Sequence, residues 1–213
     1  MARPRRSEKS KQELITIGAL GLAENGFNGT GLKQVLDQAG VPKGSFYNYF
    51  DSKEHFAAEI VRHYNQLLLD LLMARAAEPE TSPLSALRQA YEDLIALTES
   101  RDCRQNCLLG SLAAEIAATS DLCRQAISDA YGAWHLRVTE MLVYAQARHE
   151  IRRDLPAADL ADMFWNAWQG AQIRMLIDRS TDPLKQTLDM VLDHLFRPQN
   201  PTAEPAGENG ATP

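Results

Sequence analysis

The sequence contains no run of about 18 apolar residues, so we do not expect a membrane-spanning helix. The opening residues 1–6 lead into Ser, Glu and Lys rather than into an apolar stretch, which argues against a secretory signal. We therefore expect a cytoplasmic protein with no membrane partner.

Cysteine is scarce: Cys103, Cys107 and Cys123 are the only three in 213 residues. They are odd in number, and they show neither a CxxC spacing nor the Cys/His spacing of a zinc site. We interpret them as free thiols and expect no disulfide framework, no metal site and no cofactor.

Motifs typical of enzymes are missing as well. The sequence has no glycine-rich phosphate loop, no nucleophile elbow and no paired carboxylates at a recognisable spacing. The alternative enzyme would use Cys107 as a nucleophile with His135 or His149 as its base. We favour a protein that is not an enzyme.

Strand patterns are nearly absent, because β-branched residues do not alternate over any useful window. Apolar residues instead recur every three or four positions, and 45% of the chain is hydrophobic, so we expect an all-α globular fold. The expected helices and their approximate ranges are 10–25, 31–39, 42–50, 53 to at least 72, 83 to at least 95, 107–118, 121–148, 157–178 and 182–196.

The charge is unevenly distributed, which favours two domains. Up to Lys53 there are eight Lys or Arg against five Asp or Glu, a net charge of +3. The rest of the chain holds 14 against 23, a net charge of −9. The basic end is therefore the candidate for contact with phosphates, since the acidic end would repel nucleic acid.

Three short helices in the first 50 residues, with glycine between the second and third, indicate a helix-turn-helix. Phe46 and Phe50 fall on one face of the last helix and should anchor it, while polar residues occupy the other face. The competing interpretation is a compact three-helix unit with a solvated basic face. We predict that the DNA-facing residues are Thr30, Lys33, Lys43, Gly44, Ser45, Tyr47, Asn48, Tyr49 and Lys53.

The stretches 26–32, 39–50 and 52–54 resemble the N-terminal signature of the TetR family of transcription regulators at many positions with fixed spacing. The resemblance implies that residues 31–50 form the helix-turn-helix of a DNA-binding domain at 8–68. A helical sensor and dimerisation domain at 69–196 and a disordered tail at 197–213 would follow. Gly31 departs from the pattern, because many relatives place Ser or Thr there.

The sensor region around residues 107–124 resembles the branch of that family that contains NemR and AcuR, regulators that respond to reactive electrophiles or small unsaturated acids. Cys107 stands where a helix begins, and helix N–H groups and nearby arginines favour a reactive thiolate. The alternative is a small buried hydrophobe. No lysine occurs between Lys53 and Lys185, so a thiol–amine bond lacks a natural partner.

Aromatic and polar residues on the sensor helices are candidates for a pocket, although each is individually more typical of a core. The candidate pocket residues are Tyr91, Arg104, Tyr131, Trp134, His135, Phe164, Trp165, Trp168, Gln169 and Arg174. Two amphipathic stripes near the C-terminal end suit a four-helix dimer interface. They consist of Leu160, Phe164, Ala171, Met175, Leu184, Leu188, Val191 and Leu192.

The sequence therefore predicts a repressor that binds a palindromic, double-stranded operator as a homodimer and is released by a small-molecule or electrophile inducer. The alternative is a DNA-binding regulator that activates transcription or responds to no ligand.

Overall fold

The computed structural model describes residues 6–103 and 107–198, and within these ranges it contains helices and no strand. The expected all-α class is confirmed. The helices are α1 (Arg6–Gly29), α2 (Leu32–Ala39), α3 (Lys43–Phe46), α4 (Lys53–Ala76), α5 (Pro83–Glu99), α6 (Leu108–Ile116), α7 (Asp121–Ala147), α8 (Ala157–Asp178), α9 (Asp182–Asp189) and the π-helix Met190–Leu195.

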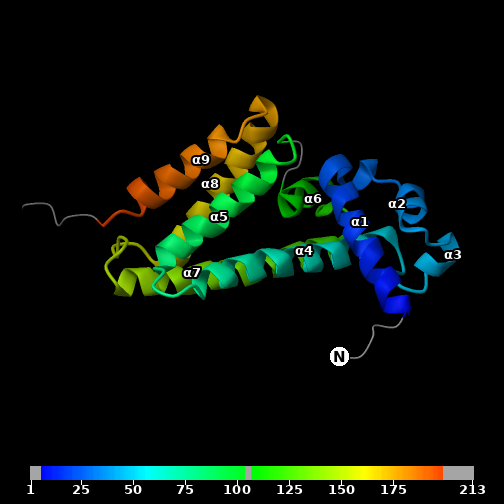
Figure 1. The fold of residues 1–213 in the computed structure, drawn as a ribbon, viewed down its shortest axis with the longest axis horizontal. Coiled ribbons are helices and arrows are strands. Elements are labelled where there is room, and N and C mark those ends of the chain that lie inside the picture. The colour runs from blue at the N-terminus through cyan, green and yellow to red at the C-terminus, as the bar shows by residue number, and fades with distance from the viewer. Residues whose placement is uncertain (1–5, 104–106, 199–213) are drawn as a thin grey trace, which may run out of the picture.

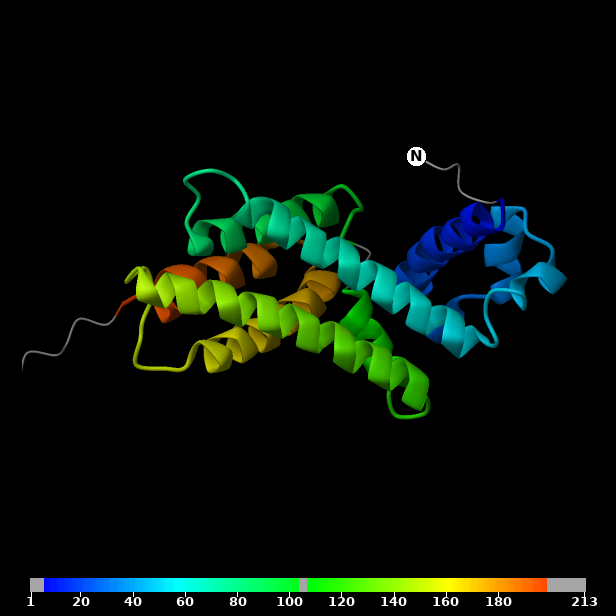
Figure 2. The same ribbon diagram turned by 90° about the horizontal axis from the view of Figure 1, so that it is seen from below.

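The molecule is elongated, with α1, α2 and α3 forming a head at one end (Figure 1). Helix α4 leaves the head and runs along the molecule beside α7, whose first turns also lie near the head (Figure 2). Helices α5, α8 and α9 pack together at the opposite end, away from the head. This layout places one long helix, α4, in both halves.

Side-chain caps explain where several helices begin. Ser52 accepts a hydrogen bond from the backbone N–H of His55 at 3.1 Å, and Ser82 accepts one from that of Ser85 at 3.2 Å. Ser120 caps α7 in the same way. Each hydroxyl satisfies an N–H that has no partner within the helix, and Pro83 costs nothing at the first position.

Several helix boundaries differ from the sequence-based expectation, most clearly in α1, α3 and the last helix. Helix α1 begins at Arg6 rather than near Ser10, and it is interrupted at Gly26, whose φ of 68° and ψ of −178° are not helical. Helix α3 ends at Phe46 instead of about Phe50, because a turn follows it in which the N–H of Phe50 still bonds the carbonyl of Phe46 at 3.0 Å. The last helix changes to π geometry at Met190.

Two clusters of buried apolar side chains hold the fold together. One fills the far half and joins α5, α8, α9 and the second half of α7. The other fills the head, but it also contains Leu108, Leu112 and Ile116 of α6 and Cys123 and Ala126 of α7. The core of the head therefore extends past the domain boundary expected after residue 68. Residues 199–213 of the expected tail lie outside the described ranges.

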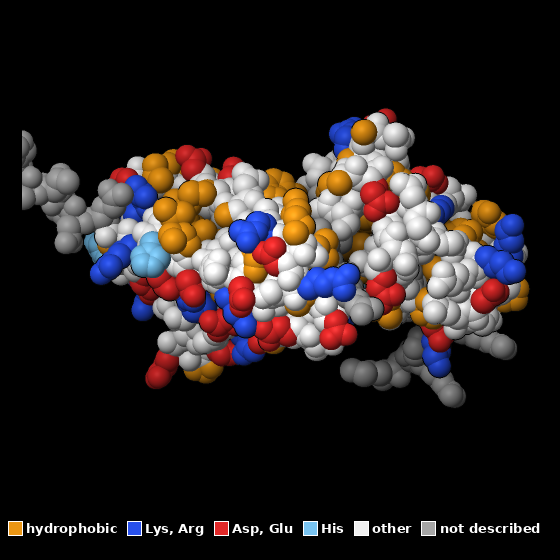
Figure 3. Space-filling model, turned by 90° about the horizontal axis from the view of Figure 1, so that it is seen from above, with side chains coloured by type: hydrophobic (Ala, Val, Ile, Leu, Met, Phe, Trp, Pro, Cys, Tyr) orange, Lys and Arg blue, Asp and Glu red, His pale blue; other side chains and the backbone are white. Residues whose placement is uncertain are grey.

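A space-filling view shows charged side chains of both signs over the surface, with apolar groups gathered over the half opposite the head (Figure 3). None of the helices in the described ranges is both long and apolar enough to cross a membrane.

Candidate nucleic-acid interface and ligand cavity

The turn between α2 and α3 is built by backbone geometry. Gly40 takes a left-handed conformation with φ 62°, which an L side chain rarely adopts. This lets the N–H of Val41 bond the carbonyl of Leu36 at 3.0 Å and ends α2. Pro42 then caps α3, and the N–H of Ser45 bonds its carbonyl at 2.8 Å. The turn sets the direction of α3.

A cluster of phenylalanines anchors α3 to the head. Phe46 and Phe50 are fully buried, and both contact Phe56 of α4 with ring centroids 5.4 and 4.7 Å away. Burying two such rings stabilises the head by several kcal/mol in total, on the order of 2 kcal/mol each. One face of α3 is thereby fixed, and the opposite face is left to solvent.

Most of the residues predicted to face DNA lie on that free surface. Lys43 and Asn48 are exposed, and the ring of Tyr47 is 55% exposed. Gly44 and Lys33 are exposed too, while Ser45 and Tyr49 are half-buried. The exposed group presents a cation, a phenol and an amide along one edge.

Two residues predicted to face DNA are turned inward instead. Thr30 is only 4% exposed, and its hydroxyl donates to the carbonyl of Gly26 at 2.7 Å. The ammonium of Lys53 donates to the carbonyl of Phe27 at 2.5 Å and lies 4.4 Å from the centre of that ring. Both groups stabilise the end of α1. The burial of Thr30 removes it from the DNA-facing surface, which corrects that prediction, whereas Lys53 is half-buried and its contact with DNA stays a prediction.

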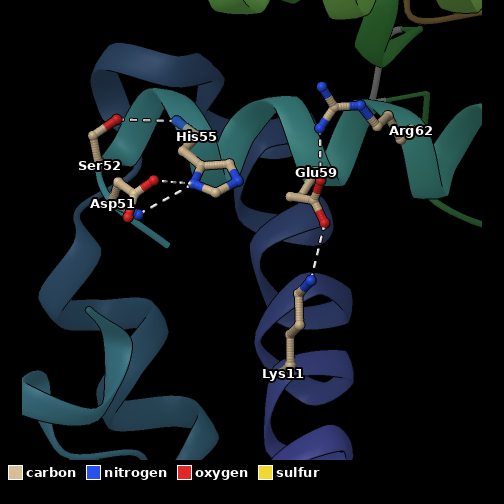
Figure 4. Close-up of polar contacts among 6 residues, drawn as sticks. All are labelled: Lys11, Asp51, Ser52, His55, Glu59 and Arg62. Atoms are coloured by element: carbon tan, nitrogen blue, oxygen red, sulfur yellow. Dashed lines mark hydrogen bonds and ion pairs between the residues drawn. The ribbon is translucent and has the colours of Figure 1, made fainter. Parts of the chain in front are cut away.

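Polar contacts fix α4 against α1 next to this surface (Figure 4). Glu59 of α4 accepts hydrogen bonds from Lys11 of α1 at 3.1 Å and from Arg62 at 2.6 Å. Burial alone would raise the pKa of Glu59, but the hydrogen bonds and charges of Lys11 and Arg62 outweigh it and lower that pKa. The carboxylate therefore stays charged and ties the two helices together.

A cavity of about 370 Å³ lies where the head meets the rest of the molecule. Its walls come from α1, α4, α5, the start of α6, α7 and α8. Five of the ten predicted pocket residues line it, as does Cys107; the five are Tyr91, Trp134, Trp165, Trp168 and Gln169.

Tyr91 organises the aromatic wall of the cavity. Its hydroxyl accepts a hydrogen bond from the indole N–H of Trp134 at 2.9 Å, and its ring meets Trp168 edge-on at 4.6 Å. Because Tyr91 is fully buried, the pKa of its phenol is raised far above the ordinary value. The phenol therefore remains neutral at every physiological pH.

Four other predicted pocket residues, all within the described part of the chain, do not line the cavity. Phe164 is fully buried in the far core, and Tyr131 and His135 both contact Asp162, beside the outer surface of α8. Arg174 is largely exposed and pairs with Asp178 at 2.8 Å. Each has a structural partner that holds it away from the cavity. Arg104 lies outside the described residues.

Sequence reasoning missed several lining residues. Gln172 is one, and its position next to Gln169 and Trp168 on one face of α8 could have identified it. Tyr64 and the α1 residues Ala19 and Ala23 gave no such signal. They reach the cavity only through contacts between segments that are far apart in the sequence.

Cys107 stands at the N-cap of α6, as expected, and is 6% exposed. Its backbone N–H donates to the side-chain oxygen of Gln172 at 3.2 Å. Its thiol contacts the hydroxyl of Tyr64, whose pKa is raised first by burial and then by this thiol. The other cysteines are buried too, and burial raises the pKa of Cys123, whose thiol donates to the carbonyl of Glu54.

The residues predicted to form the dimer interface are buried within a single chain, and this prediction is wrong. None is more than 6% exposed, because these stripes hold α8 and α9 against α5 and α7. The corrected residues are Leu160, Phe164, Ala171, Met175, Leu184, Leu188, Val191 and Leu192. The apolar side chains that these two helices and the π-helix leave exposed are Ile173, Leu176, Ile177, Met190 and Leu195.

Two family patterns match the chain. Residues 21–60 match the family described as "Bacterial regulatory proteins, tetR family", and residues 83–191 match "Tetracyclin repressor-like, C-terminal domain". The second match covers about half of the chain.

Curated relatives and solved structures are similar over most of the chain. The HTH-type transcriptional repressor DhaR of Mycobacterium sp. (strain GP1) is 32% identical over 87% of this chain and 92% of its own length. The transcriptional regulator AcuR of Cereibacter sphaeroides is 32% identical over 81% and 79%. The crystal structure of reduced NemR from E. coli superimposes with a TM-score of 0.76 and 27% identity, covering 87% and 96% of the two chains.

Proposed function

Because the chain belongs to the TetR family of bacterial regulators, we propose that it represses transcription by placing α3 in the major groove of operator DNA. The observation that carries this proposal is the exposed polar face of α3, with Lys43, Tyr47 and Asn48, seated on the buried rings of Phe46 and Phe50. A surface of that kind fits the role of a recognition helix, whose outer side chains contact base edges and phosphates.

We assign the three exposed side chains by their chemistry. Lys43 supplies the positive charge that a phosphate or a guanine edge attracts. Asn48 offers both a donor and an acceptor, which suits an adenine edge, and Tyr47 can donate to a phosphate. The cap and the turn at Gly40 hold these groups on a rigid support, so little conformational entropy is lost on binding.

A palindromic operator requires two heads about 34 Å apart, so the repressor should act as a dimer. The exposed side chains Ile173 and Ile177 on α8, with Met190 and Leu195 on the π-helix, supply an apolar surface for a second copy. We keep the helix-turn-helix at residues 31–50 and propose that residues 69–196 carry dimerisation and sensing.

The cavity is the proposed inducer site, and Cys107 in its wall is the proposed reactive group. In the electrophile form of the proposal, the thiolate sulfur adds to an activated carbon–carbon double bond. A carbon–sulfur bond forms, and the neighbouring carbon takes up a proton from solvent. A small unsaturated acid that binds without reaction is the second form.

An inducer in the cavity would lower DNA affinity by favouring a head position that does not match the operator. Helix α4 supports this coupling, because it lines the cavity with Tyr64 and carries Phe56 in the core of the head. A regulator that ignores ligands remains the alternative function. A cysteine enzyme would need a base beside Cys107, whereas His135 faces Asp162 and the carbonyl of Ala158.

Gel retardation tests the DNA-binding proposal on an operator that the protein itself selects from random duplexes. We expect Lys43→Ala with Tyr47→Ala to lower the affinity at least about tenfold, since one good base contact is worth roughly 1–3 kcal/mol. Tyr144→Ala is the matched control, because its ring is 58% exposed but lies on α7, outside the head. If both variants retain the parent affinity, α3 is not the recognition helix.

A further inference from the structure

The cavity is shared between the head and the far half of the molecule. Thr16, Ala19 and Ala23 of α1 form one wall, while Tyr91 of α5 and Trp168 of α8 belong to the opposite half. Figure 1 shows α1 in the head and α5 and α8 in the other half. A molecule that fills this cavity would therefore contact the head directly, as well as through α4.

The mouth of the cavity is apolar. Leu20 of α1, Leu67 of α4 and Leu97 of α5 line it and are 45%, 54% and 46% exposed. Exposed leucines from three helices that converge on one opening are unusual on a surface that serves packing alone. They give an apolar molecule a path from solvent into the cavity.

The interior of the cavity carries no carboxylate among its described lining residues. Its walls are mainly leucine and aromatic rings, and of the two basic lining residues Arg101 is exposed and His63 is half-buried. A cation would therefore find no carboxylate among these residues. Apart from these two residues the described lining side chains are neutral, and burying a charge among neutral apolar groups is costly.

One polar atom in the wall has no hydrogen-bond partner among the residues that the structure describes. The side-chain nitrogen of Gln169 is buried and makes no hydrogen bond, although it is a double donor. A buried donor of this kind costs roughly 1–3 kcal/mol unless an acceptor reaches it. The same wall carries Trp165 and Trp168 on either side of Gln169 along α8.

The geometry points to an uncharged, mainly apolar ligand of roughly drug size that carries one hydrogen-bond acceptor, such as a ketone, aimed at Gln169. The volume of about 370 Å³ lies in the range of cavities that hold drug-sized molecules. A small carboxylic acid would leave most of this space empty, and its charge would lie against a mainly apolar wall. This inference rests on the proposed function, in which the cavity holds the inducer.

A matched pair of fluorescent dyes tests the ligand class on the full-length protein. Prodan is a neutral naphthalene ketone, and 6-dimethylamino-2-naphthoic acid is its carboxylate counterpart. All three tryptophans of the chain line the cavity, so energy transfer from tryptophan to the dye reports binding there. We expect Prodan to bind at least about tenfold more tightly than the acid, and equal or tighter binding of the acid would overturn the inference.

Two substitutions locate the dye. Gln169→Leu removes the donor and should weaken the binding of Prodan about tenfold, which corresponds to the loss of one buried hydrogen bond. The control, Gln186→Leu on the exposed face of α9, should leave the affinity for Prodan unchanged. Ala19→Phe should block the α1 wall, whereas Ala96→Phe on the exposed face of α5 should not. Equal effects of a variant and its control would show that the dye binds elsewhere.

Operator retardation with the parent protein separates this inference from the proposed function. Release of the operator by saturating Prodan supports both. If energy transfer shows Prodan in the cavity while the operator stays bound, the ligand class stands and the inducer role of the cavity fails. If no operator can be selected at all, the repressor proposal fails, and dye binding still decides the ligand class.

Discussion

The junction between α1 and α6 should respond strongly to one added methyl group at Gly26. Gly26 has φ 68° and ψ −178°, a region that is essentially restricted to glycine. A Cβ built there would lie 2.0 Å from a carboxylate oxygen of Glu115 on α6. The other oxygen of the Glu115 carboxylate accepts two hydrogen bonds from Asn28, one from its backbone N–H at 3.0 Å and one from its side-chain nitrogen at 3.2 Å.

We expect Gly26→Ala to lower the free energy of unfolding by about 2 to 3 kcal/mol. The backbone strain accounts for roughly 1–3 kcal/mol. Displacing Glu115 adds roughly 0.5–1 kcal/mol, because the two hydrogen bonds are solvent-exposed. The reduced entropy of the unfolded chain offsets about 0.5 kcal/mol.

Thermal unfolding at a fixed protein concentration measures the effect. For a chain of this length, 1 kcal/mol shifts the melting temperature by roughly 2–4 °C, so Gly26→Ala should lower it by about 5 to 10 °C. The same change at Gly132 is the control, since this glycine lies inside α7 with nothing within 4 Å of its added Cβ. Gly132→Ala should raise the melting temperature slightly, because alanine favours a helix by roughly 0.5–1 kcal/mol.

A double-mutant cycle with Glu115→Ala separates strain from collision. Without the carboxylate, Gly26→Ala should cost only the backbone part, so the two changes should be non-additive by roughly 0.5–1 kcal/mol. The reasoning is refuted if Gly26→Ala and Gly132→Ala shift the melting temperature in the same direction, and strict additivity would rule out the contact with Glu115.

Two other changes test the sensor half. N-ethylmaleimide should add once to the native protein and not at all to the Cys107→Ser variant, because Cys107 alone of the three buried cysteines lines the cavity. Intact mass measures the number of adducts. An adduct that persists in the variant would exclude Cys107 as the reactive thiol. Ile177→Asp should convert the dimer to a monomer in sedimentation experiments, because its side chain is 73% exposed on α8 and a buried charge there would oppose association. Glu140→Asp, a change at an exposed residue of α7, is the control and should leave the dimer intact. If the Ile177→Asp variant is still a dimer, the interface lies elsewhere.

Local signals in the sequence were sufficient for most helix boundaries. The Ser82–Pro83 pair starts α5, and α8 spans the expected residues 157–178. These signals depend on groups within a few residues of each other, so they can be seen without a fold. The same holds for α3, where Phe46 and Phe50 were expected to face the core and do so.

The surface against which each apolar helix face packs could not be predicted in the same way. Periodicity shows that Leu160, Met175 and Leu188 share apolar faces, but it does not say whether the other surface belongs to the same chain or to a second copy. The inward contact of Lys53 could not be predicted for a related reason, since its acceptor, the carbonyl of Phe27, is 26 residues away and only the folded chain brings it within reach. Thr30 was misassigned although its acceptor, the carbonyl of Gly26, is only four residues away.

The position of α6 connects these observations to regulation. Its first residues, from Cys107, border the cavity, and its last turns carry Glu115 against Asn28 and Ile116 in the core of the head. Because this short helix is packed at both ends, we propose that a change at Cys107 is transmitted to the end of α1. The cavity has three contacts with the head, through α1, α4 and α6, and we propose that a ligand that alters any of them shifts the spacing of the recognition helices.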